Sequence, residues 1–353
     1  MSKKVRCAVV GLGAIGPTHV ESLGRIDNAE LVAVCDVVRE KADAVAQAQG
    51  CKAYYDFDEM LKDGDIDLVH LCVPSGMHAD LGVRAAKAGK HVLTEKPIDV
   101  TLEAADRLIA ACHEAGVVLS CISQHRFDDA MLEAREALEQ GLFGKLTFGG
   151  SHTKWYRSQE YYDSGDWRGT WALDGGGALM NQSVHYVDLL QYMMGPAEEV
   201  SAYCATLAHE RIEVEDVAAA TIKFQNGALG LLEGNTAAFP GYCTRLDIYG
   251  TDGGIIIEND QIRDRRFRAE GEGGGAFYGS ISHTPKGGAA AGKTGASSAA
   301  IGASSHQRQI QDVVDAILEG RTPKVTGEEA RSPLAIILAV YESARTGAPV
   351  KVK

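Results

Sequence analysis

Short apolar runs alternate with amphipathic segments over the first 123 residues. The apolar runs predict strands at residues 5–10, 31–35, 67–73, 91–94 and 117–121. Before the last strand, apolar residues from Leu102 to Cys112 recur at helical spacing, and Gly116 ends that predicted helix. Strands that alternate with helices in this way are typical of a parallel sheet that is covered on both faces. We therefore predict an α/β domain of the Rossmann type at residues 1–123, with its ligand at the carboxyl ends of the strands.

The rest of the chain has longer segments in which apolar and polar positions alternate. After a predicted helix at residues 129–139, these segments predict strands at residues 145–152, 198–207, 217–224, 228–234 and 244–249. The pair Asn226-Gly227 lies between two of them and predicts a two-residue hairpin turn. We therefore expect residues 124–353 to form an α+β domain on a large, mostly antiparallel open sheet.

Glycine, alanine and serine dominate residues 271–305, which offer little for a core to bury. We predict a long mobile loop or lid there rather than an interdomain linker, because structured sequence resumes after it. Two amphipathic helices are expected to close the chain, at residues 307–318 and 333–346.

Length and composition narrow the class of protein. At 353 residues the chain exceeds what one hydrophobic core usually organises, which supports two domains. The net charge of −13 and the pI near 5.3 argue against nucleic acid or an anionic membrane as a partner. No apolar run approaches a membrane span of roughly 20 residues, and the first predicted strand leaves no room for a signal peptide.

The eight cysteines are scattered without C-x-x-C spacing, and four of them fall in apolar runs: Cys7, Cys35, Cys72 and Cys121. This pattern favours buried free thiols over disulfides or metal ligands. We therefore expect a soluble protein of the reducing cytoplasm.

A glycine-rich turn follows the first predicted strand and leads into a helix. Glycines at this spacing let a pyrophosphate approach the backbone, where the helix N-terminus supplies N–H groups and a positive dipole end. We assign dinucleotide binding to Gly11, Gly13, Ala14, Ile15 and Gly16. A glycine-rich turn without a ligand is the alternative.

Asp36 lies 20 residues beyond the last of these glycines, at the end of the second predicted strand. An acid at this distance accepts hydrogen bonds from an adenosine ribose and repels a 2′-phosphate. The sequence therefore predicts NAD rather than NADP, with the reservation that Arg39 is close enough to receive such a phosphate.

Lys96 follows the predicted strand at residues 91–94, at the sheet edge where ligands bind. A partly desolvated lysine there holds or releases a proton easily. A surface lysine that merely follows a strand is the alternative.

His185 lies in a predicted helix that begins after three glycines, 175–177, with Asn181 one turn earlier on the same face. Histidine is the usual group for proton transfer near neutral pH, so this placement favours a catalytic role over a core histidine.

All three tryptophans fall in one short stretch with three tyrosines and two interleaved arginines: Trp155, Tyr156, Arg157, Tyr161, Tyr162, Trp167, Arg168 and Trp171. Amphipathic rings suit the faces and hydroxyls of a sugar, and arginine suits carboxylate or phosphate. An oligomer interface or simple loop packing would explain the stretch equally well.

These motifs together resemble the glucose-fructose oxidoreductase / inositol dehydrogenase / rhizopine-catabolism family over essentially the whole chain. The resemblance rests on the glycine turn, Glu95-Lys96-Pro97, the glycines before the helix, His185, and the closing pattern from His306 and Gln309 to Gly320-Arg321. It implies an NAD(P)-dependent oxidoreductase with a C-terminal substrate-binding and oligomerisation domain that forms homodimers or homotetramers. Lys96 would polarise the reacting hydroxyl of a sugar or cyclic polyol, and His185 would take its proton.

The resemblance also implies residue roles. The further cofactor contacts would be Pro74, Ser75, His78, Glu95, Lys96 and Gln124. The substrate contacts would be Lys96, Arg126, Tyr156, Trp167, Arg168, Asn181 and His185, and no metal is expected.

Two positions depart from the pattern of the family. Asn181 stands where inositol dehydrogenase-like members carry Asp, and resembles the branch that acts on nucleotide-linked sugars or glycosides, often at C3. Pro74-Ser75 replaces the usual Pro-Asn, which leaves that cofactor contact open. The leading hypothesis is a dehydrogenase of a sugar, glycoside or cyclic polyol. The alternatives are a glycoside-cleaving enzyme that uses transient C3 oxidation and a cofactor-sensing regulator, for which Lys96 and His185 would be unnecessary.

Overall fold

The computed structural model describes residues 4–271 and 303–353, which form two compact units. Within the described residues, the first unit comprises residues 4–124, 170–175 and 303–334, and the second comprises 125–169, 176–271 and 335–353. These units do not coincide with the predicted ranges 1–123 and 124–353, because two later segments belong to the first unit.

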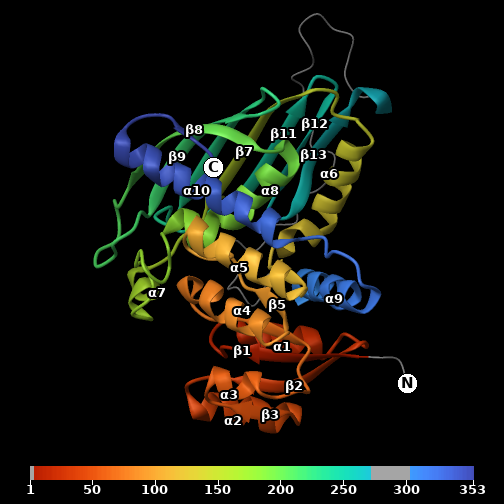
Figure 1. Cartoon of the computed structure of the whole chain (residues 1–353). Coiled ribbons are helices and arrows are strands. Elements are labelled where there is room, and N and C mark those ends of the chain that lie inside the picture. The colour runs from red at the N-terminus through yellow and green to blue at the C-terminus, as the bar shows by residue number, and fades with distance from the viewer. Residues whose placement is uncertain (1–3, 272–302) are drawn as a thin grey trace, which may run out of the picture. The chain divides into compact units, whose positions relative to one another are not determined.

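Six parallel strands form the sheet of the first unit, in the order β3-β2-β1-β4-β5-β6 (Figure 1). They are β1 (Val5–Val10), β2 (Ala29–Cys35), β3 (Lys52–Tyr54), β4 (Leu68–Leu71), β5 (His91–Thr94) and β6 (Leu119–Cys121). The predicted parallel sheet is confirmed, although β3 was missed because it is short and lacks an apolar run. The strand order reverses between β1 and β4, and ligands bind beyond the carboxyl ends of strands at such a point.

The helices of the first unit are α1 (Gly16–Leu23), α2 (Arg39–Gln49), α3 (Phe57–Leu61), α4 (His78–Lys87), α5 (Leu102–Ala115) and α9 (Ala303–Glu319). The hydroxyl of Thr101 caps α5, and Gly116 ends it in the left-handed conformation, as predicted. Helix α4 packs on α5, and α9 packs on α1. Val313 and Val314 of α9 join the same core as Val9. A helix close to the C-terminus therefore completes the core of the first unit.

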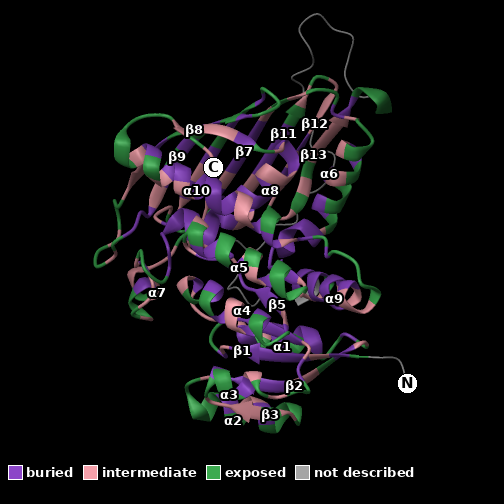
Figure 2. Cartoon of the chain, viewed as in Figure 1, coloured by how far each residue is buried: buried purple, intermediate pink, exposed green. Residues whose placement is uncertain are grey.

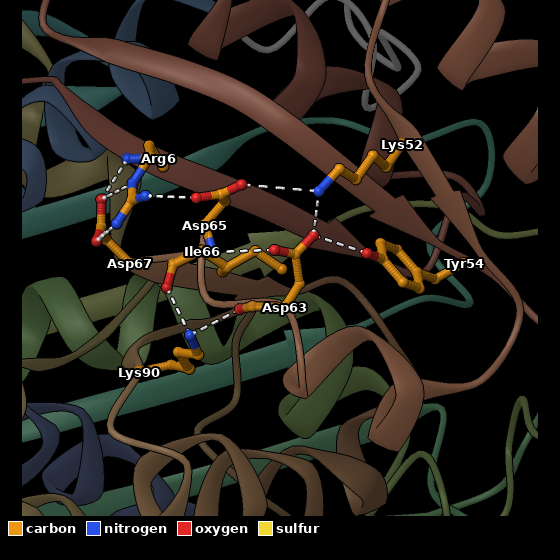
Figure 3. Close-up of polar contacts among 8 residues, drawn as sticks. All are labelled: Arg6, Lys52, Tyr54, Asp63, Asp65, Ile66, Asp67 and Lys90. Atoms are coloured by element: carbon orange, nitrogen blue, oxygen red, sulfur yellow. Dashed lines mark hydrogen bonds and ion pairs between the residues drawn. The ribbon is translucent and has the colours of Figure 1, made fainter.

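A network of charges ties the loop before β4 to the neighbouring strands (Figure 3). The carboxylate of Asp63 accepts hydrogen bonds from Lys52 at 2.7 Å and from the hydroxyl of Tyr54 at 2.7 Å. These hydrogen bonds hold the pKa of Asp63 well below its ordinary value. The ammonium of Lys90 donates to the carbonyls of Asp63 and Ile66. Contacts from β3 on one side and from Lys90, just before β5, on the other thereby hold this loop in place.

Eight strands form the sheet of the second unit, in the order β13-β12-β11-β7-β10-β9-β8-β14. They are β7 (Leu146–Lys154), β8 (Ala197–Ala205), β9 (Val217–Phe224), β10 (Leu229–Asn235), β11 (Thr244–Gly250), β12 (Gly253–Glu258), β13 (Gln261–Phe267) and β14 (Val350–Lys351). Every pair is antiparallel except β7 with β10, which confirms the prediction of a mostly antiparallel sheet. Strands β12, β13 and β14 were missed: β12 opens on two glycines, arginines and aspartate interrupt the alternation of β13, and β14 has only two residues.

The predicted turn at Asn226-Gly227 joins β9 to β10, but its loop has three residues rather than two. The N–H of Phe224 donates to the carbonyl of Ala228, which leaves Gln225, Asn226 and Gly227 in the loop. Gly227 has a φ of +87°, the left-handed conformation that ends three-residue hairpin loops.

The helices of the second unit include α6 (Asp129–Glu139), α7 (Gln159–Asp163) and α8 (Val184–Met194), and α10 covers Gly327–Thr346. Helix α8 lies against β7 and β11 (Figure 1). The predicted start of the last helix at Pro333 is wrong, since the hydroxyl of Thr326 accepts from the N–H of Glu329 and starts α10 earlier.

Buried residues follow the strands and α1, whereas α2 and α3 carry many exposed residues (Figure 2). All eight cysteines lie in the described residues as free thiols, and those predicted to be buried are buried. No described helix is long and apolar enough to cross a membrane. The predicted glycine-rich loop lies outside the described residues, apart from Gly271 and the first residues of α9.

Candidate active site

The three glycines of the turn after β1 differ in how much room the surrounding chain leaves for a side chain. A Cβ on Gly11, whose φ is +89°, would lie 2.4 Å from the carbonyl oxygen of Cys72. A Cβ on Gly16 would lie 2.3 Å from the carbonyl oxygen of Gly11. A Cβ on Gly13 would meet nothing within 4 Å. The outer glycines are thus required by the packing of the chain, whereas a side chain at Gly13 would extend into open space just before the N-terminus of α1, where phosphates commonly bind.

Asp36 at the end of β2 is connected to this turn. Its carboxylate accepts hydrogen bonds from the N–H of Leu12 at 2.7 Å and from that of Val38 at 2.8 Å. A carboxylate has further lone pairs, so Asp36 can still accept from ribose hydroxyls. The guanidinium of Arg39 lies over the ring of Tyr55, 4.0 Å from its centroid.

The predicted contacts after β4 surround a short 3₁₀ helix, Ser75–Met77, which Pro74 precedes. His78 is buried, and its ring nitrogens lie 2.8 Å from the carbonyl oxygen of Pro97 and 3.0 Å from that of Val73. His78 thus joins the loops after β4 and β5, and both of its nitrogens are engaged by the chain. Its contact with a cofactor stays a prediction.

Glu95 at the end of β5 is buried between two histidines that sequence reasoning did not assign to it. Its Oε1 lies 3.0 Å from Nε2 of His19 and 3.4 Å from Nε2 of His306. Burial alone would raise the pKa of Glu95, but the hydrogen bonds from both histidines outweigh it and hold that pKa well below its ordinary value. Its Oε2 accepts from the N–H of Lys96 at 3.1 Å, so this carboxylate fixes the backbone of a predicted catalytic residue.

Lys96 itself is half-buried, beyond the carboxyl end of β5. Gln124 is buried, and its Oε1 has no hydrogen-bond partner in the described part of the chain. An unsatisfied buried acceptor is costly, which fits a position that a bound ligand completes. All predicted cofactor contacts lie in the first unit.

Asn181 and His185 lie in the second unit, on a segment that is not one continuous α-helix as predicted. Residues Ala178–Ser183 form a π-helix, and α8 begins at Val184. The predicted single helix is therefore a π-helix followed by an α-helix, with Asn181 in the first and His185 in the second. The structure describes every residue from 178 to 190, and all are buried except Asn181 and His185, which are half-buried. Turns of π-helix are frequent at functional sites.

Glu215 holds the start of this segment, a role that sequence reasoning missed. Its carboxylate accepts from the N–H groups of Gly177 at 3.0 Å and Leu179 at 2.8 Å, and its carbonyl accepts from that of Ala178. A Cβ on Gly177 would lie 1.8 Å from the Glu215 carbonyl oxygen, which explains this glycine. Burial raises the pKa of Glu215 to about 7.

The aromatic stretch forms a connected cluster in the second unit, apart from Trp171, which lies in the first. The guanidinium of Arg168 lies 4.3 Å from the ring centroid of Tyr161 and 4.4 Å from that of Trp167. Gln182 donates to the hydroxyl of Tyr161 at 2.9 Å and to Oδ1 of Asn181 at 3.1 Å. The structure thus connects three predicted substrate contacts: Asn181, Trp167 and Arg168.

The other two predicted substrate contacts of this unit have structural partners. Arg126 is buried, its guanidinium lies 2.8 and 2.6 Å from the carboxylate of Asp188, and it stacks over Tyr192. It therefore anchors the start of the second unit to α8. Tyr156 lies edge-to-face against Phe239, with ring centroids 5.2 Å apart. Contact of either residue with a substrate stays a prediction.

Comparison with protein families gives two matches along the chain. The model of the oxidoreductase family with an NAD-binding Rossmann fold matches residues 5–123. The model of the GFO/IDH/MocA C-terminal domain matches residues 131–256.

Individual relatives agree with these matches. The chain is 33% identical to a myo-inositol 2-dehydrogenase of Thermotoga maritima over 264 residues, which cover 72% of this chain and 75% of that protein. It is 27% identical to the scyllo-inositol 2-dehydrogenase (NAD(+)) of Bacillus subtilis, over 99% of this chain and 97% of that protein. Among solved structures, the WlbA dehydrogenase from Bordetella pertussis in complex with NADH and UDP-GlcNAcA has a TM-score of 0.85 and 32% identity, with 99% of each chain covered.

Proposed function

Because the chain belongs to the Gfo/Idh/MocA oxidoreductase family and has its NAD-binding Rossmann domain, we propose that it oxidises or reduces a secondary alcohol of a sugar, glycoside or cyclic polyol. The observation that carries the proposal is the glycine turn at the carboxyl end of β1, whose Leu12 N–H donates to the carboxylate of Asp36 at the end of β2. The names of the relatives, which include inositol dehydrogenases, support this substrate class.

When bound, NAD supplies the hydride acceptor or, in its reduced form, the hydride donor. The residues that would hold it are the backbone of the glycine turn for the pyrophosphate and Asp36 for the ribose. Gln124 offers its unsatisfied Oε1 to the same ligand.

In the direction of oxidation, the ammonium of Lys96 donates a hydrogen bond to the reacting hydroxyl and stabilises negative charge on its oxygen. His185 accepts the hydroxyl proton as a general base. Glu95 keeps Lys96 in place through its backbone N–H. Asn181, Trp167 and Arg168 supply substrate contacts from the second unit.

One observation favours a particular substrate subclass, an anionic sugar such as a nucleotide-linked or uronic sugar. Among the described residues, neither Arg157 nor Arg168 forms an ion pair with a carboxylate, although both lie over the ring of Tyr161. Arginine side chains without a counter-ion are suited to carboxylate or phosphate. The ligand named for the WlbA dehydrogenase supports this subclass.

We also propose that the chain forms homo-oligomers through the open face of the second sheet. Leu229, Leu231 and Tyr203 are exposed on strands whose other side is buried. Leu229 pairs in register with Phe148, which extends the apolar surface. The free cysteines fit a reducing cytoplasm as the location.

The test is a panel of sugars, polyols, glycosides and nucleotide sugars with NAD, in which the NADH absorbance and the products are measured. A ketone product supports a dehydrogenase, and a higher kcat/KM for anionic members supports the subclass. A released aglycone would establish the glycoside-cleaving alternative. No turnover across the panel, with NADH binding intact, would favour a cofactor-sensing regulator.

A further inference from the structure

A second histidine lies directly against His185 in the second unit. The rings of His125 and His185 are edge-to-face, with centroids 5.1 Å apart and planes at 76°. His125 belongs to the 3₁₀ helix Gln124–Phe127 and is only 3% exposed. The proposed function above gives this histidine no role.

Two carboxylates meet one nitrogen of this buried ring. Nδ1 of His125 lies 2.7 Å from Oδ2 of Asp128 and 3.3 Å from Oδ1 of Asp260. Burial alone would lower the pKa of His125, but its hydrogen bonds to the two carboxylates raise it to about 10. Nε2 is buried and has no hydrogen-bond partner in the described residues. His125 is therefore an imidazolium at neutral pH, with both carboxylates on its Nδ1 side.

Asp260 is brought to this position by a tight turn. Asn259 and Asp260, with φ of +50° and +61°, join β12 to β13 in a two-residue hairpin loop. Left-handed conformation at both loop residues is the type I′ turn that asparagine and aspartate tolerate. The hydroxyl of Tyr186 donates to Asp260 at 2.8 Å and accepts from that of Thr244 at 2.7 Å. Tyr186, which follows His185 in the sequence, thus fixes the carboxylate of Asp260 that contacts His125.

Among the described residues of the second unit, we also considered the ionisable side chains on the elements that pack around His185: the π-helix, α8, β7 and β11. Asp188 on α8 is paired with Arg126, and the π-helix carries no ionisable side chain. Helix α8 contacts buried positions of β7 and β11, and side chains alternate along a strand. The ionisable side chains of these strands occupy the alternate positions: His152, Lys154, Arg245, Asp247 and Tyr249.

We propose that His125 is a positioning residue that acts as a fixed cation beside His185 and keeps it neutral, and so able to accept a proton from substrate. The proposal rests on the proposed function, in which His185 is the general base. A positive charge about 5 Å away disfavours a second one, so the charge on His125 lowers the pKa of His185 relative to a neutral side chain at position 125. The edge-to-face contact also restrains the orientation of the His185 ring.

The direct test is an NMR titration of the histidine Cε1–H groups in the full chain, with His185 assigned by its loss in His185→Gln. In the wild type we expect His185 to titrate while His125 stays charged. In His125→Gln the pKa of His185 should rise by about one unit or more. The acidic limb of the pH profile of kcat/KM should move by the same amount.

His152→Gln is the matched control, since this ring is in the same unit but pairs with Glu233. The control should leave the titration of His185 unchanged. An unchanged His185 pKa in a folded His125→Gln protein would overturn the proposal. If that variant does not fold, a His125 ring that is already neutral at the pH where His185 titrates in the wild type would overturn it. A shifted titration without a shifted rate profile would support the coupling of the two rings and refute the base role of His185.

Discussion

The carboxylate of Asp36 accepts a hydrogen bond from the backbone N–H of Leu12, at 2.7 Å. The acid that is expected to recognise the ribose therefore also holds the turn that is expected to receive the pyrophosphate. We therefore expect the side chain of Asp36 to determine both the cofactor specificity and the geometry of the turn.

Cofactor preference follows from this arrangement. We expect a higher kcat/KM with NAD than with NADP, since Asp36 repels a 2′-phosphate and Arg39 is held over Tyr55. Asp36→Ser should reduce the preference by at least about tenfold, which corresponds to about 1.4 kcal/mol. Glu40→Ser, which removes an exposed acid of α2, is the control. Equal use of both cofactors by the wild type would contradict the assignment.

Two glycines of the turn should respond differently to alanine. Gly13→Ala should keep the melting temperature and lose NADH affinity by about tenfold or more, because its Cβ enters open space that the ligand needs. Gly16→Ala should lower the melting temperature, because its Cβ lies 2.3 Å from the carbonyl oxygen of Gly11. Thermal melts and NADH fluorescence titrations measure both effects. A Gly13→Ala protein with normal NADH affinity would show that the pyrophosphate binds elsewhere.

The catalytic assignments predict large losses of rate with small changes in cofactor binding. Lys96→Ala and His185→Ala should each lower kcat by roughly 10²–10⁴-fold, the usual contribution of proton transfer or charge stabilisation. His185→Ala should also remove the acidic limb of the pH profile. Steady-state kinetics and NADH titrations measure these effects, and near wild-type turnover in either variant would refute its role.

Asn181 is expected to act on substrate through the cluster that includes Gln182 and Arg168. Asn181→Asp keeps an acceptor for Gln182 but adds a negative charge, which disfavours an anionic sugar and favours the imidazolium of His185. We expect a higher KM for anionic substrates and an acidic limb at higher pH. A kinetic profile identical to the wild type in pH and substrate preference would make Asn181 structural.

Glu215 makes stability depend on pH. Its pKa is about 7 in the folded protein against 4.5 as the ordinary value, so the folded state binds more protons between these values. Stability therefore falls as the pH rises from about 4.5 to 7, by linkage. Melting temperatures between about pH 5 and 8 should show this decline, and Glu215→Gln should weaken it. Glu199→Gln, which changes a half-buried acid of β8, is the control, and a decline as steep in Glu215→Gln as in the wild type would refute the assignment.

Local patterns were enough to predict the two sheets, the glycine turn, and the positions of Lys96 after β5 and of His185 in a helix. Strand alternation and glycine conformation depend on neighbouring residues, so they can be read from the chain itself. The same patterns misplaced the start of α10 and the length of the hairpin loop at Gly227. In α10 the cap is the hydroxyl of Thr326, and spacing alone does not show which hydroxyl will accept a backbone N–H.

Contacts between distant segments could not be predicted from local patterns. Glu215 accepts the N–H groups that start the π-helix, and Asp260 reaches His125 from a hairpin turn far along the chain. Helix α9 completes the core of the first unit from near the C-terminus. Such partners are selected by burial, because a buried charge or N–H group must be satisfied by whichever group the fold brings to it. The amino-acid order was therefore sufficient for the class of fold and the principal chemical groups, whereas the charges around Glu95 and His125 and the partner of the π-helix depend on how the chain packs.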